Sequence, residues 1–243
     1  MTNATIIGLT VRNGLGTRRA VVLVLLPLVL VGLASILRAL VGVDTDATEG
    51  VVLGLGIGVV LPLVALICAT SVLAAEVDDG SIVYLLAKPI SRHVIVVSKY
   101  VVAVTATTLF TVLPIMLACA ILTGELRPTL AYGLGALLGA VVYCAIFLLL
   151  SAATRHAVAT GLLYVLVWEG LLGGLLSGVR WLSVGAWAQG LAEAVAGKRA
   201  GLAPSSVEPV GPAYAIVAAA VVTVAALWLA GDRLRSFRLT GEE

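Results

Sequence analysis

Long apolar runs constrain this chain more than any other feature of its sequence. A helix needs about 20 mainly apolar residues to cross the hydrocarbon core of a bilayer. Six segments reach that length, at about 20–42, 51–75, 98–123, 129–153, 157–177 and 213–231. Because backbone polar groups in lipid must bond within their own segment, these runs predict helices. We therefore expect an all-α integral membrane protein with six transmembrane helices.

Composition supports a single membrane domain spanning residues 1–243. The chain is 61% hydrophobic and 12% charged, whereas a soluble domain is roughly half apolar and a quarter charged. The net charge is only +2, and no basic patch is interleaved with aromatic residues. We therefore expect the lipid bilayer to be a partner of this chain and nucleic acid not to be one.

Lysine and arginine positions predict the orientation, because these residues favour the cytoplasmic side of a membrane. With the N-terminus inside, the basic residues assigned to the cytoplasm are Arg12, Arg18, Arg19, Lys88, Arg92, Lys99, Arg155, Arg233, Arg235 and Arg238. The outside receives only Arg127, Arg180, Lys198 and Arg199. Arg38, near the outer end of the first span, can extend to the interface. An even number of spans returns the C-terminus to the cytoplasm.

Two segments outside the spans have helical patterns of their own. Residues 1–19 mix apolar and basic side chains, which is typical of an interfacial helix, although a frayed basic tail has the same composition. In the outer loop 178–212, apolar residues recur at helical spacing and predict an amphipathic helix on, or dipping into, the outer surface. These residues are Val184, Trp187, Leu191 and Val195.

Small residues and prolines inside the spans predict how the helices pack. Glycines recur four apart at Gly50/Gly54/Gly58, Gly135/Gly139 and Gly170/Gly174/Gly178. Such spacing lets helices approach closely in lipid, within one chain or between two copies. Pro62 and Pro114 are expected to kink the second and third spans. Cys68, Cys119 and Cys144 lie in apolar runs without metal-ligand spacing, and we interpret them as small hydrophobic residues.

The stretch "EVDDGSIVYLLAKPISRHVIVVSKY", which begins at Glu76, interrupts the apolar pattern between the second and third spans. Asp78 and Asp79 can cap a short helix running from about Gly80 to Ala87. Pro89 cannot continue that helix, and Ser91 can cap the next one. A flexible linker needs only Gly and Ser. The sequence therefore predicts a stiff, partly apolar docking element, within a cytoplasmic loop covering 76–97.

The same stretch resembles the loop between the second and third spans of ABC-2 type permeases, the membrane subunits of ATP-binding-cassette exporters. The resemblance rests on Glu76, Gly80-Ser81, Leu85-Leu86, Pro89, Ser91-Arg92 and Lys99. It implies that the short helix is a coupling helix that docks on an ATPase. The implied coupling residues are Glu76, Asp79, Gly80, Ser81, Ile82, Leu85, Leu86, Pro89, Ser91, Arg92 and Lys99.

The resemblance also implies an assembly in a prokaryotic plasma membrane. Two permease subunits, identical or related, would form a dimer above two cytoplasmic ATPase subunits, which would bind ATP and Mg. Residues 1–19 would form the interfacial connecting helix. The chain itself lacks a phosphate-binding loop, because its one Gly-Lys pair, Gly197-Lys198, has no upstream glycine at the required spacing and is followed by Arg199. We therefore expect no catalytic residue, no metal and no cofactor bound by this chain.

Several charged residues have alternative interpretations. Glu76 either anchors the loop to Arg92, Lys99 or the connecting helix, or is a solvated interfacial acid. Arg92 and Lys99 fit loop structure and membrane-stop signals equally. Glu169 is the one acid inside an apparent span, so it is expected to face protein or water. It could gate the path, mark a re-entrant turn or line the export route.

The resulting functional hypothesis is a permease subunit that exports a hydrophobic or amphipathic molecule. A non-transporting membrane anchor or signal transmitter driven by an ATPase would use the same docking helix. Haem-export permeases have a similar loop, although the run Pro89–Arg92 fits them less well. A secondary carrier would need ion-coupling residues at mid-membrane and usually inverted repeats, and neither is visible. A membrane enzyme would need a catalytic constellation, which the spans lack.

Overall fold

The regular structure in the described part of this chain is entirely helical. The computed structural model describes residues 17–43, 48–78, 92–154, 156–172, 179–197 and 210–236. The α-helices are α2 (Thr17–Leu40), α4 (Leu61–Asp78), α6 (Arg92–Thr107), α7 (Leu113–Thr123), α8 (Leu126–Ala153), α9 (Ala157–Leu163), α11 (Val184–Ala196) and α12 (Pro212–Ser236). Three segments are π-helical, namely η1 (Gly50–Val60), η2 (Thr108–Val112) and η3 (Tyr164–Leu172), and η4 (Val179–Leu182) is a short 3₁₀ helix.

Within the described residues, five helical segments are long and apolar enough to cross a membrane. They cover Val21–Leu40, Gly50–Val72, His93–Thr123, Leu126–Ala153 and Pro212–Arg233. Each agrees closely with a predicted span. The sixth predicted span, 157–177, is different, because its described helix, α9 with η3, covers 16 residues, Ala157 to Leu172. That helix is shorter than the roughly 20 residues a crossing needs, and residues 173–178 lie outside the described part.

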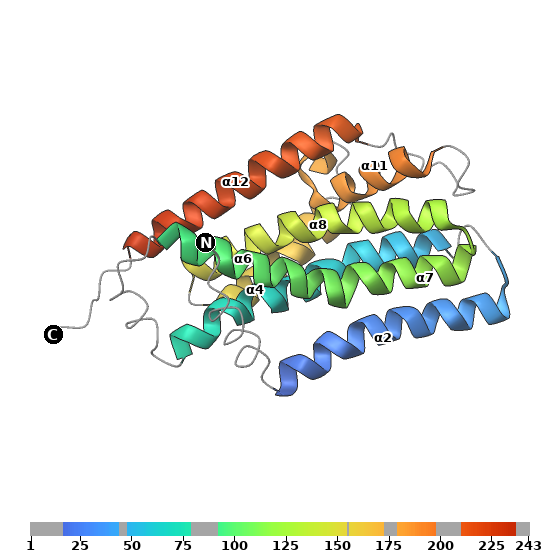
Figure 1. Ribbon diagram of the computed structural model, residues 1–243, viewed down its shortest axis with the longest axis horizontal. Coiled ribbons are helices and arrows are strands. Elements are labelled where there is room, and N and C mark those ends of the chain that lie inside the picture. Colours follow the sequence, from blue (N-terminus) through green and yellow to red (C-terminus); the bar gives the residue numbers. More distant parts are fainter. Residues whose placement is uncertain are drawn as a thin grey trace.

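The long helices run lengthwise between two ends of the bundle (Figure 1). At the end where α2 begins, α4 also ends, α6 begins and α12 ends, so these helix ends are grouped together. At the opposite end, α7 turns into α8 through Gly124, which adopts the left-handed conformation with φ 71°. Glycine tolerates that conformation without a Cβ penalty. The alternating directions agree with the predicted order of crossings.

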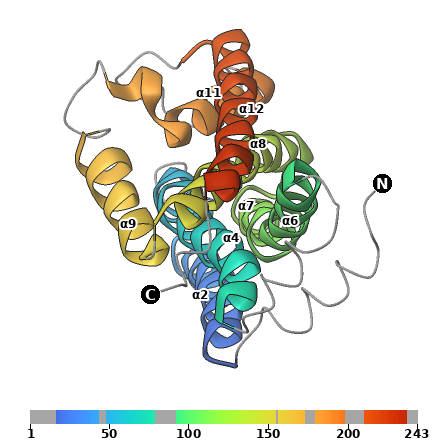
Figure 2. The same ribbon diagram turned by 90° about the vertical axis from the view of Figure 1, so that its left-hand side faces the viewer.

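The centre of the bundle is formed by α8 and by the continuous helix of η1 and α4. In both, 61% of the spanning window is buried, against 22% for α2 and for α12. Viewed along the bundle, α2 and α12 lie at opposite edges with α4 and α8 between them (Figure 2). The core therefore consists of the second and fourth spans, whereas the first and last offer most of their apolar surface to their surroundings.

Two prolines mark abrupt changes of helix type within the spans. Pro62 is the second residue of α4 and Pro114 is the second residue of α7, each directly after a π-helical segment. Just before them, Leu61 N–H donates to Gly56 O and Leu113 N–H donates to Thr108 O, which are i→i−5 bonds. A proline lacks the N–H for an α-helical bond and crowds the carbonyl four residues earlier. The predicted disruptions thus take the form of widened helical turns.

Polar groups inside the spans are satisfied mainly by the backbone of their own helix. Thr70 donates to Leu66 O at 2.7 Å, and Ser98 donates to Val94 O at 2.8 Å. Such i−4 bonds remove the cost of a hydroxyl in lipid. The three cysteines are free and buried, as predicted. Arg38 reaches across the bundle end, where its Nη1 donates to Leu122 O at 3.0 Å and satisfies a carbonyl at the C-terminal end of α7.

The glycine repeats differ sharply in what they contact. Added Cβ atoms at Gly135 and Gly139 would collide with α11 and with Leu61, so these glycines do allow close packing. Cβ atoms at Gly50 and Gly54 would meet nothing within 4 Å. The prediction of close packing within the chain is therefore confirmed for the α8 pair and wrong for Gly50 and Gly54, which are exposed.

Candidate functional site

The predicted coupling loop connects α4 to α6 at the end of the bundle where α2 begins. Glu76 lies in the helical backbone near the end of α4, and Arg92 is the first residue of α6. The other loop residues lie outside the described part of the chain, and these are Asp79, Gly80, Ser81, Ile82, Leu85, Leu86, Pro89 and Ser91. Residues 1–16 of the predicted connecting helix also lie outside it.

Lys99 is buried between the two helices that carry this loop. Its side chain is 2% exposed, and its Nζ donates to the carbonyl oxygen of Val72 at 2.9 Å. Lys99 belongs to the second turn of α6, and Val72 lies one helical turn before Glu76 on α4. The ammonium group therefore joins α4 to α6 directly above the loop. This position is internal to the helix bundle, and the structural role and the stop-signal role predicted for Lys99 both stay predictions.

His93 packs against the last span. A Cβ added at Gly231 of α12 would lie 3.1 Å from His93 Cγ and would overlap the imidazole ring further along. The absence of a side chain at Gly231 thus lets the first turn of α6 rest directly on α12. Sequence reasoning assigned His93 only an interfacial role, because the glycine lies 138 positions later in the chain and no local pattern links them.

Glu169 holds the N-terminal end of α11. Its Oε2 accepts from Ser183 Oγ at 2.6 Å and from Gly185 N at 3.3 Å, and its Oε1 accepts from Val184 N at 2.9 Å. The first N–H groups of a helix have no partner within the helix. A carboxylate placed there also interacts favourably with the helix dipole. Glu169 is thus a cap supplied by a different segment, η3, and it stabilises the turn that precedes α11.

Aromatic side chains fix the same turn from several directions. Trp168 Nε1 donates to Leu182 O at 3.3 Å, and Trp187 Nε1 donates to Trp181 O at 2.8 Å. Tyr214 of α12 donates from its hydroxyl to the same Trp181 oxygen at 3.0 Å. The turn Val179–Ser183 is therefore tied to η3, α11 and α12. Sequence reasoning placed Trp187 on an apolar helix face but missed both indole hydrogen bonds, since each goes to a backbone carbonyl rather than to a recognisable partner side chain.

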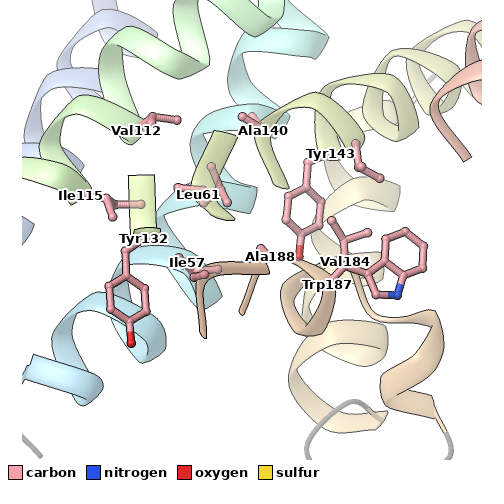
Figure 3. Close-up of a cluster of buried hydrophobic side chains, with 14 of the residues drawn as sticks. Ile57, Leu61, Val112, Ile115, Tyr132, Ala140, Tyr143, Val184, Trp187 and Ala188 are labelled. Atoms are coloured by element: carbon pink, nitrogen blue, oxygen red, sulfur yellow. The ribbon is translucent and has the colours of Figure 1, made fainter. Parts of the chain in front are cut away.

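A buried tyrosine completes the surroundings of the Glu169 carboxylate. Figure 3 shows Tyr143 of α8 with its hydroxyl directed toward α11, beside Ala188 and Val184. A Cβ added at Gly185 would lie 3.2 Å from Glu169 Oε2 and 3.7 Å from both the Ser183 and Tyr143 hydroxyl oxygens. The Tyr143 ring stacks on Phe147 with centroids 5.8 Å apart. The acid therefore lies where α8, η3 and α11 meet.

The predicted amphipathic helix in the outer loop exists as α11, but it is more deeply placed than a surface helix. Val184 and Trp187 are buried as predicted, whereas Val195 is 37% exposed. The buried face instead includes the small residues Ala188 and Ala192. Sequence reasoning weighted large apolar residues, but at Gly135 and Gly139 of α8 the helices approach so closely that the facing residues of α11 are alanines. Ser183, the cap of the first turn, accepts from Ala186 N at 3.2 Å.

An open apolar groove of about 460 Å³ lies between α2 and the junction of η2 with α7. The lining is apolar except for Ser35, whose hydroxyl donates to Val31 O at 2.8 Å and is therefore satisfied. The other lining residues are Val24, Pro27, Leu28, Val31, Gly32, Phe110 and Pro114. Pro27, Gly32 and Pro114 have small or no side chains. They therefore fill little of the space between the helices.

The charged groups described above position helices through hydrogen bonds to backbone and side-chain atoms. No group of three or more His, Cys, Asp or Glu side chains is arranged to hold a metal ion in the part of the chain that the structure covers. Both charged residues join helices. Lys99 joins α6 to α4 at one end of the bundle, and Glu169 joins η3 to α11 toward the other end. Both are therefore suited to transmitting or restraining helix movement.

Comparison with known proteins gives a match over most of the chain. A family model described as "ABC-2 family transporter protein" matches residues 6–229, which includes the first four spans described above and most of the last. A search of curated proteins returned no match.

Proposed function

Since the chain belongs to the ABC-2 transporter family, we propose that it is the permease subunit of an ABC exporter driven by a separately encoded ATPase. The observation that carries this proposal is the family match over residues 6–229. It agrees with the five helices in the described part of this chain that are able to cross a membrane. In this proposal the membrane is the prokaryotic plasma membrane, and six crossings place both termini in the cytoplasm.

Coupling would occur through the loop between α4 and α6. Two permease subunits form the translocation path, and each docks its loop on one of two ATPase subunits that bind ATP and Mg. Movement of the loop then reaches the spans through the helices on either side of it. The Lys99 bond to Val72 supports this route, because it makes α4 and α6 respond together rather than separately.

A hydrophobic or amphipathic molecule is the substrate class that fits best. The groove between α2 and η2 offers apolar side chains to the lipid-facing side of the bundle, and the described spans carry few charges. Apolar pockets with few polar groups take ligands of that kind. An ion or a sugar would require convergent polar side chains along the path.

The test is co-purification with the ABC ATPase encoded next to this gene. Gly80→Asp and Leu85→Asp place a charge on the predicted coupling helix, and Leu202→Asp in the predicted outer loop is the matched control. We expect the native chain and Leu202→Asp to retain the ATPase, and the two loop variants to lose it. Failure of the folded native chain to bind the ATPase would remove the proposed mechanism.

A further inference from the structure

The groove between α2 and the junction of η2 with α7 lies at the edge of the bundle. Over its spanning window α2 is 22% buried, and Val24 and Leu28 of the groove are exposed. The volume of about 460 Å³ is in the range of small-molecule sites. The one polar lining side chain, Ser35, already donates to Val31 O. The walls therefore favour an apolar occupant over water, which needs several polar partners.

The groove follows the axis of α2. Its lining residues on that helix recur three or four positions apart, from Val24 through Leu28 and Val31 to Ser35, so they form one stripe. Arg38 continues the stripe one step beyond Ser35. The distance along the helix from Arg38 back to Val24 is about 21 Å. Because the hydrocarbon of one leaflet is about 15 Å deep, an extended acyl chain that starts at Arg38 fills the groove and passes the middle of the membrane.

A charged group lies at one end of this stripe. Arg38 is half-buried, and its Nη1 donates to Leu122 O of α7 at 3.0 Å. The guanidinium therefore joins the two helices that form the walls of the groove. It carries five N–H donors, and within the described residues Leu122 O is the one acceptor that it reaches. Its other donors remain available to a ligand.

The position and chemistry of Arg38 suit a lipid phosphate. Arg38 lies two residues before Leu40, the last residue of the first span, and basic side chains near span ends extend to the membrane interface. A guanidinium can bind two oxygens of one phosphate through parallel hydrogen bonds. A lipid whose chain lies in the groove thus has its phosphate at the depth of the Arg38 donors.

We infer that the groove binds a phospholipid of the surrounding bilayer, with one acyl chain along α2 and the phosphate on Arg38. In the orientation predicted from the basic residues, this lipid belongs to the outer leaflet. It fills the space between α2 and α7 and so holds the first span to the bundle. The apolar walls suit an exported amphipathic molecule as well, but the charged end favours a phospholipid. The inference goes beyond the proposed function and does not depend on it.

The first experiment measures lipid binding to the purified full chain by native mass spectrometry in detergent. The probes are dioleoyl phosphatidylcholine, dioleoyl phosphatidylglycerol and dioleoylglycerol, which has no phosphate. Arg38→Gln is compared with Arg127→Gln, the same substitution at an exposed arginine. Arg127 belongs to α8 and lies beside Gly197 rather than along the groove. Glutamine at position 38 can still donate to Leu122 O, so the helix end stays satisfied.

We expect both phospholipids to bind the native chain and dioleoylglycerol to bind much more weakly. Arg38→Gln should lower phospholipid affinity about tenfold, as loss of a charge-assisted hydrogen bond does. Arg127→Gln should leave it unchanged, and Arg38→Lys, which keeps the charge, should retain most of it. Equal affinities in Arg38→Gln and Arg127→Gln, or binding of dioleoylglycerol as tight as that of the phospholipids, would overturn the inference.

The second experiment locates the acyl chain. Gly32→Leu fills the groove, and Gly54→Leu is the control, because a Cβ at either glycine meets nothing within 4 Å. We expect Gly32→Leu to lose the bound phospholipid and Gly54→Leu to keep it. A phosphatidylcholine with a diazirine at its chain end should cross-link near Val24 and Phe110. Cross-links distributed evenly over α2 and α12, or equal binding by the two leucine variants, would contradict the site.

The third experiment distinguishes a bilayer lipid from an exported molecule. The chain is assembled with its ATPase in dioleoyl phosphatidylcholine vesicles, and the diazirine lipid is cross-linked before and during ATP hydrolysis. We expect the yield at the groove to stay constant. A yield that falls during hydrolysis would identify the occupant as the transported molecule and overturn the inference. Absence of ATPase binding would count against the proposed function alone, because the first two experiments use this chain by itself.

Discussion

Lys99 shows how a single charged residue can be stable inside a membrane bundle. Its ammonium group is almost fully enclosed, and a backbone carbonyl of the neighbouring helix accepts its hydrogen bond. An ionisable group in a span is costly unless it is paired and faces protein. The residue therefore serves the junction of α4 and α6, which the sequence alone could not distinguish from an interfacial charge.

Replacing Lys99 should separate packing from charge. We expect Lys99→Ala to destabilise the protein by about 2–5 kcal/mol, because it removes a buried side chain together with a charged hydrogen bond. Lys99→Met keeps a chain of similar length, so its loss should be smaller. Val97→Ala, on an exposed position of α6 (44%), should cost no more than about 0.5 kcal/mol. Thermal unfolding in detergent compares all three, and equal losses for the Ala and Met variants at position 99 would contradict the role of packing.

Helix contacts depend on which glycine of a repeat is considered. The spacing of four residues occurs in both η1 and α8, yet only Gly135 and Gly139 contact another segment closely. The sequence predicted where close approach was possible but not where it occurs, because the partner alanines of α11 lie more than 40 positions further along the chain. Large apolar residues predicted the existence of α11, whereas the small residues Ala188 and Ala192 determine how it packs against α8.

This difference predicts opposite outcomes for the same substitution. Gly135→Ala places a methyl group against the Ala188 carbonyl, so we expect it to destabilise the protein by about 1–3 kcal/mol, as overpacking does. Gly54→Ala meets nothing within 4 Å, and alanine favours helices, so stability should be unchanged or slightly higher. The two variants can be compared by thermal unfolding monitored by size-exclusion chromatography. Similar destabilisation in both would contradict the packing of α8 against α11.

At the scale of the whole molecule, hydropathy predicted most of the fold. Five of the six predicted spans are found in the part of the chain that the structure describes, with ends within a few residues of those expected. For the fifth, the described helix covers Ala157 to Leu172, and the next described segment is the turn that precedes α11. Glu169 was the signal of that turn, and its partners, Ser183 to Gly185, come from the next helix. For the coupling loop, the assignment remains a sequence prediction.

The orientation of the whole molecule can be tested with reporter fusions. Basic residues predict both termini in the cytoplasm. A fluorescent protein fused after Glu243 should therefore fluoresce, and alkaline phosphatase at the same site should be inactive. Phosphatase fused after Gly124, between α7 and α8, should be active. Active phosphatase at the C-terminus would contradict the cytoplasmic placement of that end of the chain.

The π-helical winding of η1 also determines how the chain tolerates a change in length. In an α-helix, one deleted residue turns everything beyond it by about 100° and exchanges buried for exposed side chains. Each hydrogen bond of a π-helix encloses one residue more than a bond of an α-helix. When one residue is deleted, the segment can therefore convert to α-helical bonds and keep the residues beyond it in place. Deletion of Gly54 should therefore preserve the yield of folded protein, measured by fluorescence-detected size exclusion. Deletion of Leu137, near the middle of α8, should abolish it. The second span can then lose a residue without losing its register.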